Sequence, residues 1–256
     1  MMRSNMTFKI TLSDVDLLKN SIPTIAEIID EGVFKVGKDG ISLLSPDRTM
    51  VSVIDFKLLS SAFEEYNVEA EESLGLNMAN FAALLKRLKS GDKLILESTG
   101  KSNRLKMTVK GNGVRTFELP LIDVKMEKPP IDQLQFNTKI ELECGVVEEG
   151  IADAEIIGDS IVIEAAQDSF KMHAKGDVSS AQLELAKDDK GLLKLESAQA
   201  VKAQYPLEYL KKMIKANKLT KQLMLEFGTD YPMRMSFKSL DKMQLSFILA
   251  PRVSED

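Results

Sequence analysis

The sequence contains few of the residues on which most site chemistry depends. Its 256 residues include one cysteine, one histidine and no tryptophan. One cysteine excludes an internal disulfide, which favours an intracellular location. One histidine excludes a zinc site built from clustered histidines and cysteines, and neither G-x-x-x-x-G-K-S/T nor G-x-G-x-x-G is present to bind phosphates. We therefore expect a binding or scaffolding protein with no cofactor, no metal and no catalytic activity.

Long apolar runs are also missing. No stretch approaches the ~20 apolar residues that span a bilayer, and no signal segment opens the chain, so we expect no membrane partner. The apolar fraction of 44% is nevertheless enough for a globular core. The length fits one large domain or two of medium size.

The scarce residues have simple structural interpretations. Cys144 ends a strand-like run, where it suits a small buried hydrophobe better than a nucleophile. His173 lies in a strand pattern without a catalytic partner. A remote alternative, a metal-dependent enzyme, would use a group of acidic residues: Glu148, Glu149, Asp153 and Glu155. Their helical spacing favours an exposed acidic face instead.

The chain repeats itself. Three short stretches recur in the same order, residues 9–12 as 139–142, 28–33 as 156–161, and 94–97 as 223–226. Their offsets of 130, 128 and 129 residues are close to half the chain length. Two tandem copies of one domain are the simplest explanation.

Hydrophobic periodicity predicts the same plan in both halves. We expect helices over 14–30, 77–90, 146–156 and 206–217, the first capped by Ser13 or Asp14 and broken at Pro23. We expect strands over 7–12, 33–36, 40–44, 49–55, 93–98, 104–110, 114–119, 139–144, 160–165, 169–174, 181–186, 192–195, 222–227, 233–237 and 243–249. This is an α+β class: a helix-backed antiparallel sheet domain, duplicated.

A proline-rich stretch divides the two copies. Residues 120–135 contain three of the eight prolines, including the pair Pro129-Pro130, which is typical of a semi-rigid linker. We therefore predict an N-terminal domain over 1–118, a connector over 119–135 and a C-terminal domain over 136–256.

Basic residues gather on two of the predicted helices, although the formal net charge is −5. Residues 202–221 carry +5 and residues 78–93 carry +3. In each helix an apolar stripe faces away from the basic side chains, so a row of cations meets solvent. Such a row can contact phosphates without reading bases; the alternative is an ordinary solvated face. Helix geometry selects Arg87, Lys89, Lys211, Lys212 and Lys218.

Four stretches carry a family resemblance: Gly40–Asp47, Leu74–Met78, Leu119–Val124 and Leu249–Val253. In order and spacing they resemble the DNA sliding clamp family, proliferating cell nuclear antigen (PCNA), most nearly its archaeal form. The resemblance extends from about residue 6 to residue 256.

The resemblance implies a processivity fold in which three chains form a ring around duplex DNA, with helices lining the hole. It implies DNA replication and repair functions in the cytoplasm or nucleoid. DNA polymerase, clamp loader, flap nuclease and ligase would bind through short peptide motifs. A subunit of a heterotrimeric or specialised clamp is the alternative. By position, the residues that match channel-facing lysines of the family are Lys19, Lys86 and Lys215.

The resemblance also implies two protein-binding sites. A partner-peptide pocket would comprise Pro46, Met50, Val51, Val124, Met126, Pro232, Leu249, Ala250 and Pro251, although Val51 and Leu249 also suit a core. The subunit interface would pair one edge strand, Val114, Arg115, Thr116, Phe117, Glu118 and Leu119, with another, Ser180, Ala181, Gln182, Leu183, Glu184, Leu185 and Ala186.

The sequence departs from the family pattern at several of these positions. Pro46 stands where the family often has methionine, which stiffens or shrinks the pocket. Acidic residues replace the usual basic ones at Glu148, Glu149, Glu155 and Glu208. One quarter of the inner helices would then repel phosphate. Either the other helices hold the DNA, or these carboxylates bind another subunit or suit a high-salt cytoplasm.

Overall fold

The computed structural model describes residues 6–99, 102–125 and 128–252. The chain separates into two compact units. Unit 1 comprises Met1–Pro46, Ile54–Pro129 and Ser239–Leu245, and unit 2 comprises Asp47–Val53, Pro130–Lys238 and Ser246–Asp256. Each unit combines antiparallel sheets with two α-helices, so the α+β class is confirmed. The exact limits 1–118, 119–135 and 136–256 stay a prediction.

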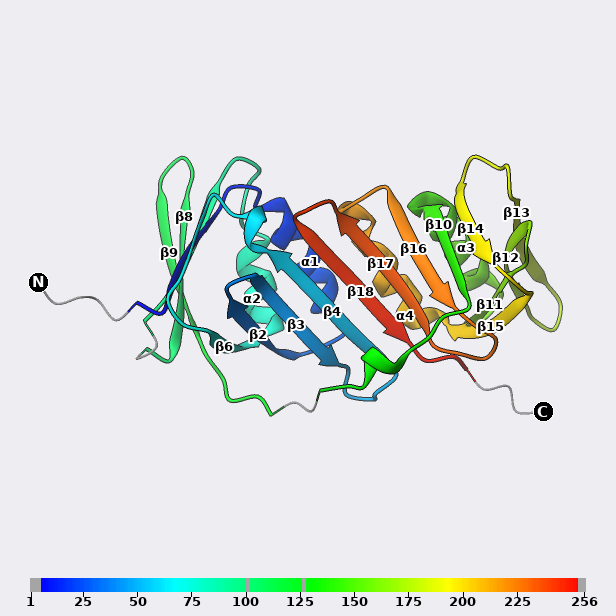
Figure 1. Cartoon of the computed structure of the whole chain (residues 1–256), viewed down its shortest axis with the longest axis horizontal. Helices are drawn as coiled ribbons and strands as arrows, with labels where there is room; N and C mark the ends of the chain where they lie inside the picture. The colour runs from blue at the N-terminus through cyan, green and yellow to red at the C-terminus, as the bar shows by residue number, and fades with distance from the viewer. Residues whose placement is uncertain (1–5, 100–101, 126–127, 253–256) are drawn as a thin grey trace, which may run out of the picture. The chain divides into compact units, whose positions relative to one another are not determined.

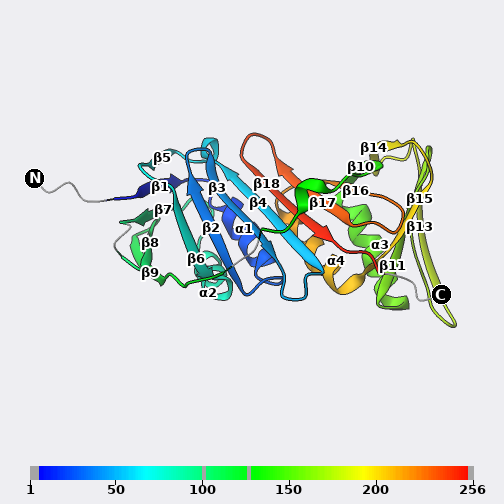
Figure 2. The ribbon, with the colours of Figure 1, turned by 60° about the horizontal axis from the view of Figure 1, so that its bottom comes forward.

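Unit 1 contains two sets of adjacent strands and a helix pair (Figures 1 and 2). One sheet has the order β5-β1-β7-β8-β9, and β6-β2-β3-β4 are neighbours in another. Helix α1 packs against α2 and is visible behind β2, β3 and β4 in Figure 2. The elements are β1 (Phe8–Leu12), α1 (Asp16–Ile25), β2 (Glu31–Gly37), β3 (Gly40–Pro46), β4 (Ser52–Leu59), η1 (Ser60–Ala62), β5 (Glu65–Val68), β6 (Glu72–Asn77), α2 (Met78–Leu85), β7 (Lys93–Ser98), β8 (Arg104–Lys110) and β9 (Val114–Pro120).

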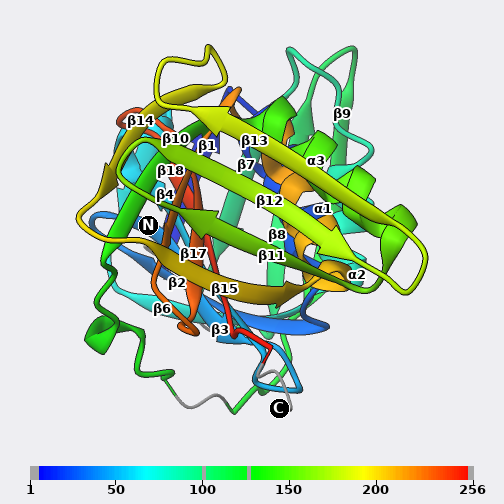
Figure 3. The ribbon, with the colours of Figure 1, turned by 90° about the vertical axis from the view of Figure 1, so that its right-hand side faces the viewer.

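Unit 2 repeats this arrangement. Strands β14-β10-β16-β17-β18 are neighbours, and β13-β12-β11-β15 form a separate sheet. Figure 3 shows that separate sheet with α3 beside it, and α3 packs on β12 and β13. The elements are η2 (Ile131–Gln133), β10 (Thr138–Glu143), α3 (Cys144–Ile157), β11 (Ser160–Ala165), β12 (Ser169–Lys175), β13 (Ser180–Ala186), β14 (Leu192–Ser197), β15 (Val201–Pro206), α4 (Leu207–Met213), η3 (Ile214–Lys218), β16 (Gln222–Phe227), β17 (Met233–Ser239) and β18 (Met243–Leu249).

The repeated stretches occupy equivalent positions in the two units. In unit 1, β1 pairs with β7 and Ile10 lies opposite Leu96. In unit 2, β10 pairs with β16 and Ile140 lies opposite Leu225. The same two recurring sequences therefore form the same antiparallel pair twice, which confirms the duplication.

Apolar faces of the helices close the cores. On α4 and the η3 segment that follows it, the apolar side chains of Leu207, Leu210, Met213 and Ile214 are buried. On α2, Phe81 is buried and meets the ring of Phe34 edge-on, with ring centroids 5.7 Å apart. The expected helix over 77–90 is shorter than predicted, since α2 ends at Leu85 and the basic residues Lys86, Arg87 and Lys89 lie in the turn that follows it.

Two expectations about α1 were wrong. The helix continues through Pro23 and ends at Ile25, because a proline near the last turn removes only one backbone hydrogen bond. Its N-cap is Val15, and no side chain from Ser13 or Asp14 caps it. None of the described helices is long and apolar enough to cross a membrane.

Candidate functional site

The basic side chains of unit 1 lie on α1 and in the turn that follows α2. Lys19 is on α1, whereas Lys86, Arg87 and Lys89 come after the last residue of α2, Leu85, and are exposed. In the described part of the chain these last three make no ion pair with an acidic side chain. They therefore present free positive charge to solvent.

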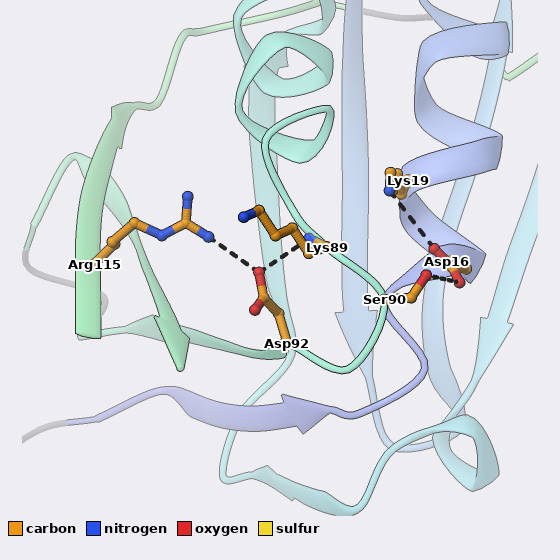
Figure 4. A network of polar contacts seen from close by, with 6 residues as sticks. All are labelled: Asp16, Lys19, Lys89, Ser90, Asp92 and Arg115. Carbon is orange, nitrogen blue, oxygen red and sulfur yellow. Dashed lines mark hydrogen bonds and ion pairs between the residues drawn. The ribbon is translucent and has the colours of Figure 1, made fainter. Parts of the chain in front are cut away.

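A buried carboxylate fixes the turn that carries them (Figure 4). Asp92, 6% exposed, accepts the backbone N–H of Lys89 at 3.0 Å and an Arg115 guanidinium nitrogen at 3.0 Å. Arg115 also donates to the carbonyl of Arg87 at 3.4 Å. A Cβ at Gly111 would lie 2.1 Å from Asp92 Oδ1, so only glycine fits beside this carboxylate. The basic turn is thus held to strand β9.

A second contact joins this turn to α1. Ser90 Oγ donates to Asp16 Oδ2 at 2.9 Å, and Lys19 Nζ lies 3.9 Å from Asp16 Oδ1 (Figure 4). Asp16 partly offsets the charge of Lys19. Within unit 1, Lys86, Arg87 and Lys89 are therefore the stronger candidates for contacting phosphate.

In unit 2, acidic residues of α3 contact residues of α4 and η3. The ammonium of Lys211 pairs with Glu155, and Asn217 Nδ2 donates to Glu148 Oε2 at 2.9 Å. Lys212 Nζ lies 5.4 Å from the centre of the Tyr209 ring, within cation–π range. Lys215 and Lys218 are exposed on η3. The acidic helix therefore neutralises one of the candidate lysines, Lys211.

The loop before β4 and the C-terminal tail lie together in unit 2. The amide of Ala250 donates to the carbonyl of Val51 at 2.9 Å. Met50 is 66% exposed and has a φ of 59°, a conformation rare for a non-glycine residue. Leu249 is completely buried, as its alternative core interpretation requires.

The remaining pocket candidates are divided between the two units. Pro232 and Pro251 are in unit 2, and Pro46 and Val124 are in unit 1. Met126 lies outside the described residues.

Asp47 organises that loop. Its carboxylate accepts the Ser52 amide at 2.8 Å, the Tyr209 hydroxyl at 2.7 Å and the Thr49 hydroxyl. Burial raises the pKa of Asp47, but the hydrogen bonds from Thr49, Ser52 and Tyr209 outweigh it and hold the pKa below its ordinary value. The loop is therefore tied to helix α4 by an ionised carboxylate.

The tail is held by a charged pair as well. Both terminal nitrogens of Arg252 bind the carboxylate of Asp159, at 2.8 and 2.7 Å. The Arg252 amide donates to the carbonyl of Gln204 at 2.7 Å. The hydrogen-bonded guanidinium lowers the pKa of Asp159. These contacts keep the segment that follows β18 close to β15.

Two sheets end in edge strands of equal length. Among the described residues, no strand pairs with the outer edge of β9 in unit 1 or of β13 in unit 2. Side chains of both strands alternate between exposed and half-buried along most of their length. Unpaired edges of this length are prone to pairing with another chain. All the predicted interface residues, 114–119 and 180–186, lie on these two strands.

Cys144, His173 and the acidic residues of α3 are the residues with alternative chemical interpretations. In the described ranges, no three His, Cys, Asp or Glu side chains converge to hold a metal, the α3 acids included. Cys144 is buried, and burial raises the pKa of its thiol to about 11. His173 contacts Glu164 at 3.1 Å on the surface of the sheet.

Family models match both halves of the chain. Residues 7–128 match the N-terminal domain of proliferating cell nuclear antigen, and residues 130–252 match its C-terminal domain. The chain belongs to the PCNA family. It consists of two tandem PCNA domains, as the sequence resemblance predicted.

Full-length PCNA relatives are found among archaea. The chain is 38% identical over 250 residues to the DNA polymerase sliding clamp of Thermococcus gammatolerans and 36% identical to that of Pyrococcus furiosus. Both matches cover 98% of this chain and 100% of the relative.

Solved PCNA structures share the fold. PCNA of Thermococcus kodakaraensis superimposes with a TM-score of 0.90 at 29% identity, covering 96% of this chain and 100% of that one. A chain of the PCNA2–PCNA3 complex of Sulfolobus tokodaii gives a TM-score of 0.87 at 30% identity, covering 95% and 99%.

Sequence reasoning missed the residues that hold this PCNA-family site in place. Asp47, Asp92 and Tyr209 are largely buried, whereas periodicity and resemblance point to exposed cations and apolar pocket residues. Asp47 and Asp92 occupy turns, after Ser-Pro and Ser-Gly, where an aspartate commonly binds nearby backbone N–H groups. That turn chemistry was the available signal.

Proposed function

We propose that this chain is a DNA sliding clamp: three copies close into a ring around duplex DNA and tether replication and repair proteins, without catalysis. The observation that carries the proposal is the match over 98% of the chain to relatives named DNA polymerase sliding clamp. The geometry of the edge strands and of the basic turns supports it.

Ring closure would use the two free edges. Strand β9 of one copy would pair with β13 of the next, and the backbone N–H and C=O groups of both edges would then have hydrogen-bond partners. Because the two edges belong to different units, the contact is head-to-tail, and such contacts form rings when the rotation closes. Three copies give a closed assembly of six units.

The basic side chains would face the enclosed DNA. Lysine and arginine contacts to phosphate are independent of sequence and weaken with salt. Lys86, Arg87 and Lys89 carry unpaired charge for this role in unit 1, and Lys212, Lys215 and Lys218 extend from unit 2. A ring that encloses the duplex needs only weak contacts of this kind, and tight ones would impede sliding.

Client proteins would bind where the Met50 loop meets the tail. Short peptides that insert apolar anchors into a groove and pair backbone with an adjacent segment are a common recognition mode. The polymerase, clamp loader, flap nuclease and ligase would share this site. In this proposal, their competition for it determines which enzyme acts on the DNA.

Two experiments test the proposal together. Size-exclusion chromatography with light scattering measures the mass of the assembly, and primer extension on a circular template measures processivity. We expect a particle of about three times 28.5 kDa and polymerase processivity that depends on the clamp. A Lys212→Glu, Lys215→Glu variant should assemble normally but support shorter products. A strict monomer at micromolar concentration, or synthesis that ignores the wild-type protein, would contradict the proposal.

A mixed ring is the second candidate. It is favoured by the Sulfolobus tokodaii relative, whose structure is a complex of two different PCNA chains. In that case the chain alone would not form a trimer, and paralogues from the same organism would restore one. Light scattering of the chain with and without those paralogues separates the two cases.

A further inference from the structure

The segment between β3 and β4 is a short loop whose conformation depends on few contacts. Met50 adopts a left-handed φ of 59°, which a non-glycine residue keeps only when its surroundings impose it. The Met50 side chain is 66% exposed, so its own packing does not supply that restraint. The restraint must come from the residues on either side.

Asp47 supplies most of the restraint on the backbone of Met50. Its carboxylate is 6% exposed and accepts hydrogen bonds from the amide of Ser52 and from the amide and hydroxyl of Thr49, closing the loop on itself. All these bonds stay within the loop. They define its internal shape but do not fix its position on the rest of the unit.

Tyr209 provides the connection to a helix. Its hydroxyl donates to Asp47 Oδ2 at 2.7 Å and lies 2.9 Å from Thr49 Oγ1. Tyr209 is 8% exposed in the middle of α4, a helix whose Leu207, Leu210 and Met213 are anchored in the core. A hydrogen bond to an ionised, buried carboxylate is about twice as strong as one between neutral groups. This phenol therefore joins the Asp47 side of the loop to a rigid element, while the Val51 carbonyl on the other side accepts the Ala250 amide.

We propose that Tyr209 is a positioning residue for client binding: its hydroxyl holds Asp47, and through it the Met50–Val51 corner, in the conformation that accepts a client peptide. This inference rests on the proposed function, because it presupposes that the loop forms one wall of the client site. The opposite wall is already fixed, since Ala250 bonds to Val51 and Arg252 to Asp159.

The test replaces Tyr209 by phenylalanine, which removes the hydroxyl and keeps the ring. The matched control is Tyr66→Phe in unit 1, where a half-buried phenol donates to the carbonyl of Gly37 at 2.6 Å. The probe is a synthetic peptide with an aliphatic residue followed three and four positions later by two phenylalanines, titrated calorimetrically. We expect its Kd to rise about tenfold in Tyr209→Phe and to stay within twofold in Tyr66→Phe.

A double-mutant cycle separates positioning from loss of stability. Once Asp47→Ala has removed the acceptor, Tyr209→Phe should change the peptide Kd less than twofold further, because the two residues act as one unit. Equal, additive losses in the two backgrounds would overturn the proposal. Hydrogen exchange of the free protein gives an independent readout: Tyr209→Phe should speed exchange in residues 47–53 and leave unit 1 unchanged.

The outcomes distinguish this inference from the function beneath it. If wild-type protein binds the peptide and Tyr209→Phe binds equally well, the positioning role is wrong while the clamp proposal stands. If wild-type protein does not bind the peptide, the client site and the positioning role both fail, whatever the exchange data show. Trimer formation and processivity, measured on the same samples, then report separately on the ring.

Discussion

Neutralising Glu155 is a direct way to ask how the acidic helix affects DNA binding. In Glu155→Gln the side chain keeps its shape but loses the charge that pairs with Lys211. Both side chains are about half exposed, at 51% and 43%. We therefore expect the free energy of unfolding to change by less than about 0.5 kcal/mol. The lysine, however, gains freedom to contact phosphate.

The size of the DNA effect follows from counterion release. Each added phosphate contact steepens the slope of log K against log salt by roughly 0.9 on duplex DNA. Each released lysine that contacts a phosphate therefore raises affinity on the order of several-fold at 0.1 M salt, and the gain shrinks as salt is added. Fluorescence anisotropy with a labelled duplex between 50 and 200 mM salt measures both quantities.

Asp153→Asn is the matched control. Asp153 is exposed on the same helix, and in the described part of the chain it has no ion-pair partner. Its substitution changes net charge by the same amount but releases no lysine. We expect a clearly smaller change in slope than for Glu155→Gln. Equal slopes in the two variants, or no change in either, would refute the idea that Glu155 restrains Lys211.

Three further predictions concern stability and reactivity. Gly40→Ala should lower the free energy of unfolding by about 2–5 kcal/mol, because its Cβ would lie 2.2 Å from the carbonyl oxygen of Leu58. Gly91→Ala, where φ is positive but the surrounding space is open, should lower it by only about 1–2 kcal/mol. Chemical denaturation measures both values. The pKa of Asp47 in the folded protein lies below its ordinary value of 3.8, so the ionised carboxylate stabilises the fold. The difference in free energy of unfolding between wild type and Asp47→Asn should therefore be largest above about pH 4 and should diminish as the pH falls toward the lowered pKa. Denaturant titration at several pH values measures this difference. Cys144, with its thiol pKa raised to about 11, should react with iodoacetamide at pH 8 only after unfolding, as mass spectrometry would show; rapid modification of the folded protein would contradict its burial.

Strands with regular alternation were predictable from the sequence to the residue. Strands β7, β8, β11, β16 and β18 have the predicted bounds, because each buries alternate or contiguous apolar residues between clear turn signals. Strand β5 was missed since none of its four side chains is fully buried, and its pairing with β1 is its main support. Strand β6 was missed because Leu74, Gly75 and Leu76 are all buried, which hides the alternation.

The candidate site was predictable only in part. Cations on an amphipathic helix can be identified from spacing, and all eight basic candidates are indeed on helices α1 and α4, on η3 or in the turn just after α2. The ion pair of Lys211 with Glu155 joins residues 56 positions apart, so no local pattern reveals it. The bond between Asp47 and Tyr209 spans 162 positions and depends on the fold in the same way.

Only part of the negative charge on α3 is offset by a described contact. Glu155 forms an ion pair with Lys211, whereas the hydrogen bond from the neutral Asn217 amide leaves the charge of Glu148 in place, and Glu149 and Asp153 have no partners in the described ranges. On unit 1, by contrast, the side chains of Lys86, Arg87 and Lys89 make no ion pair with an acidic side chain of the described residues, and the nearby carboxylate of Asp92 is buried and paired with Arg115. If the ring encloses DNA, phosphate contacts should concentrate on the three copies of unit 1. Reversing Lys86 and Lys89 should then shorten polymerase products more than reversing Lys212 and Lys215, and the opposite order would show that unit 2 guides the duplex despite its carboxylates.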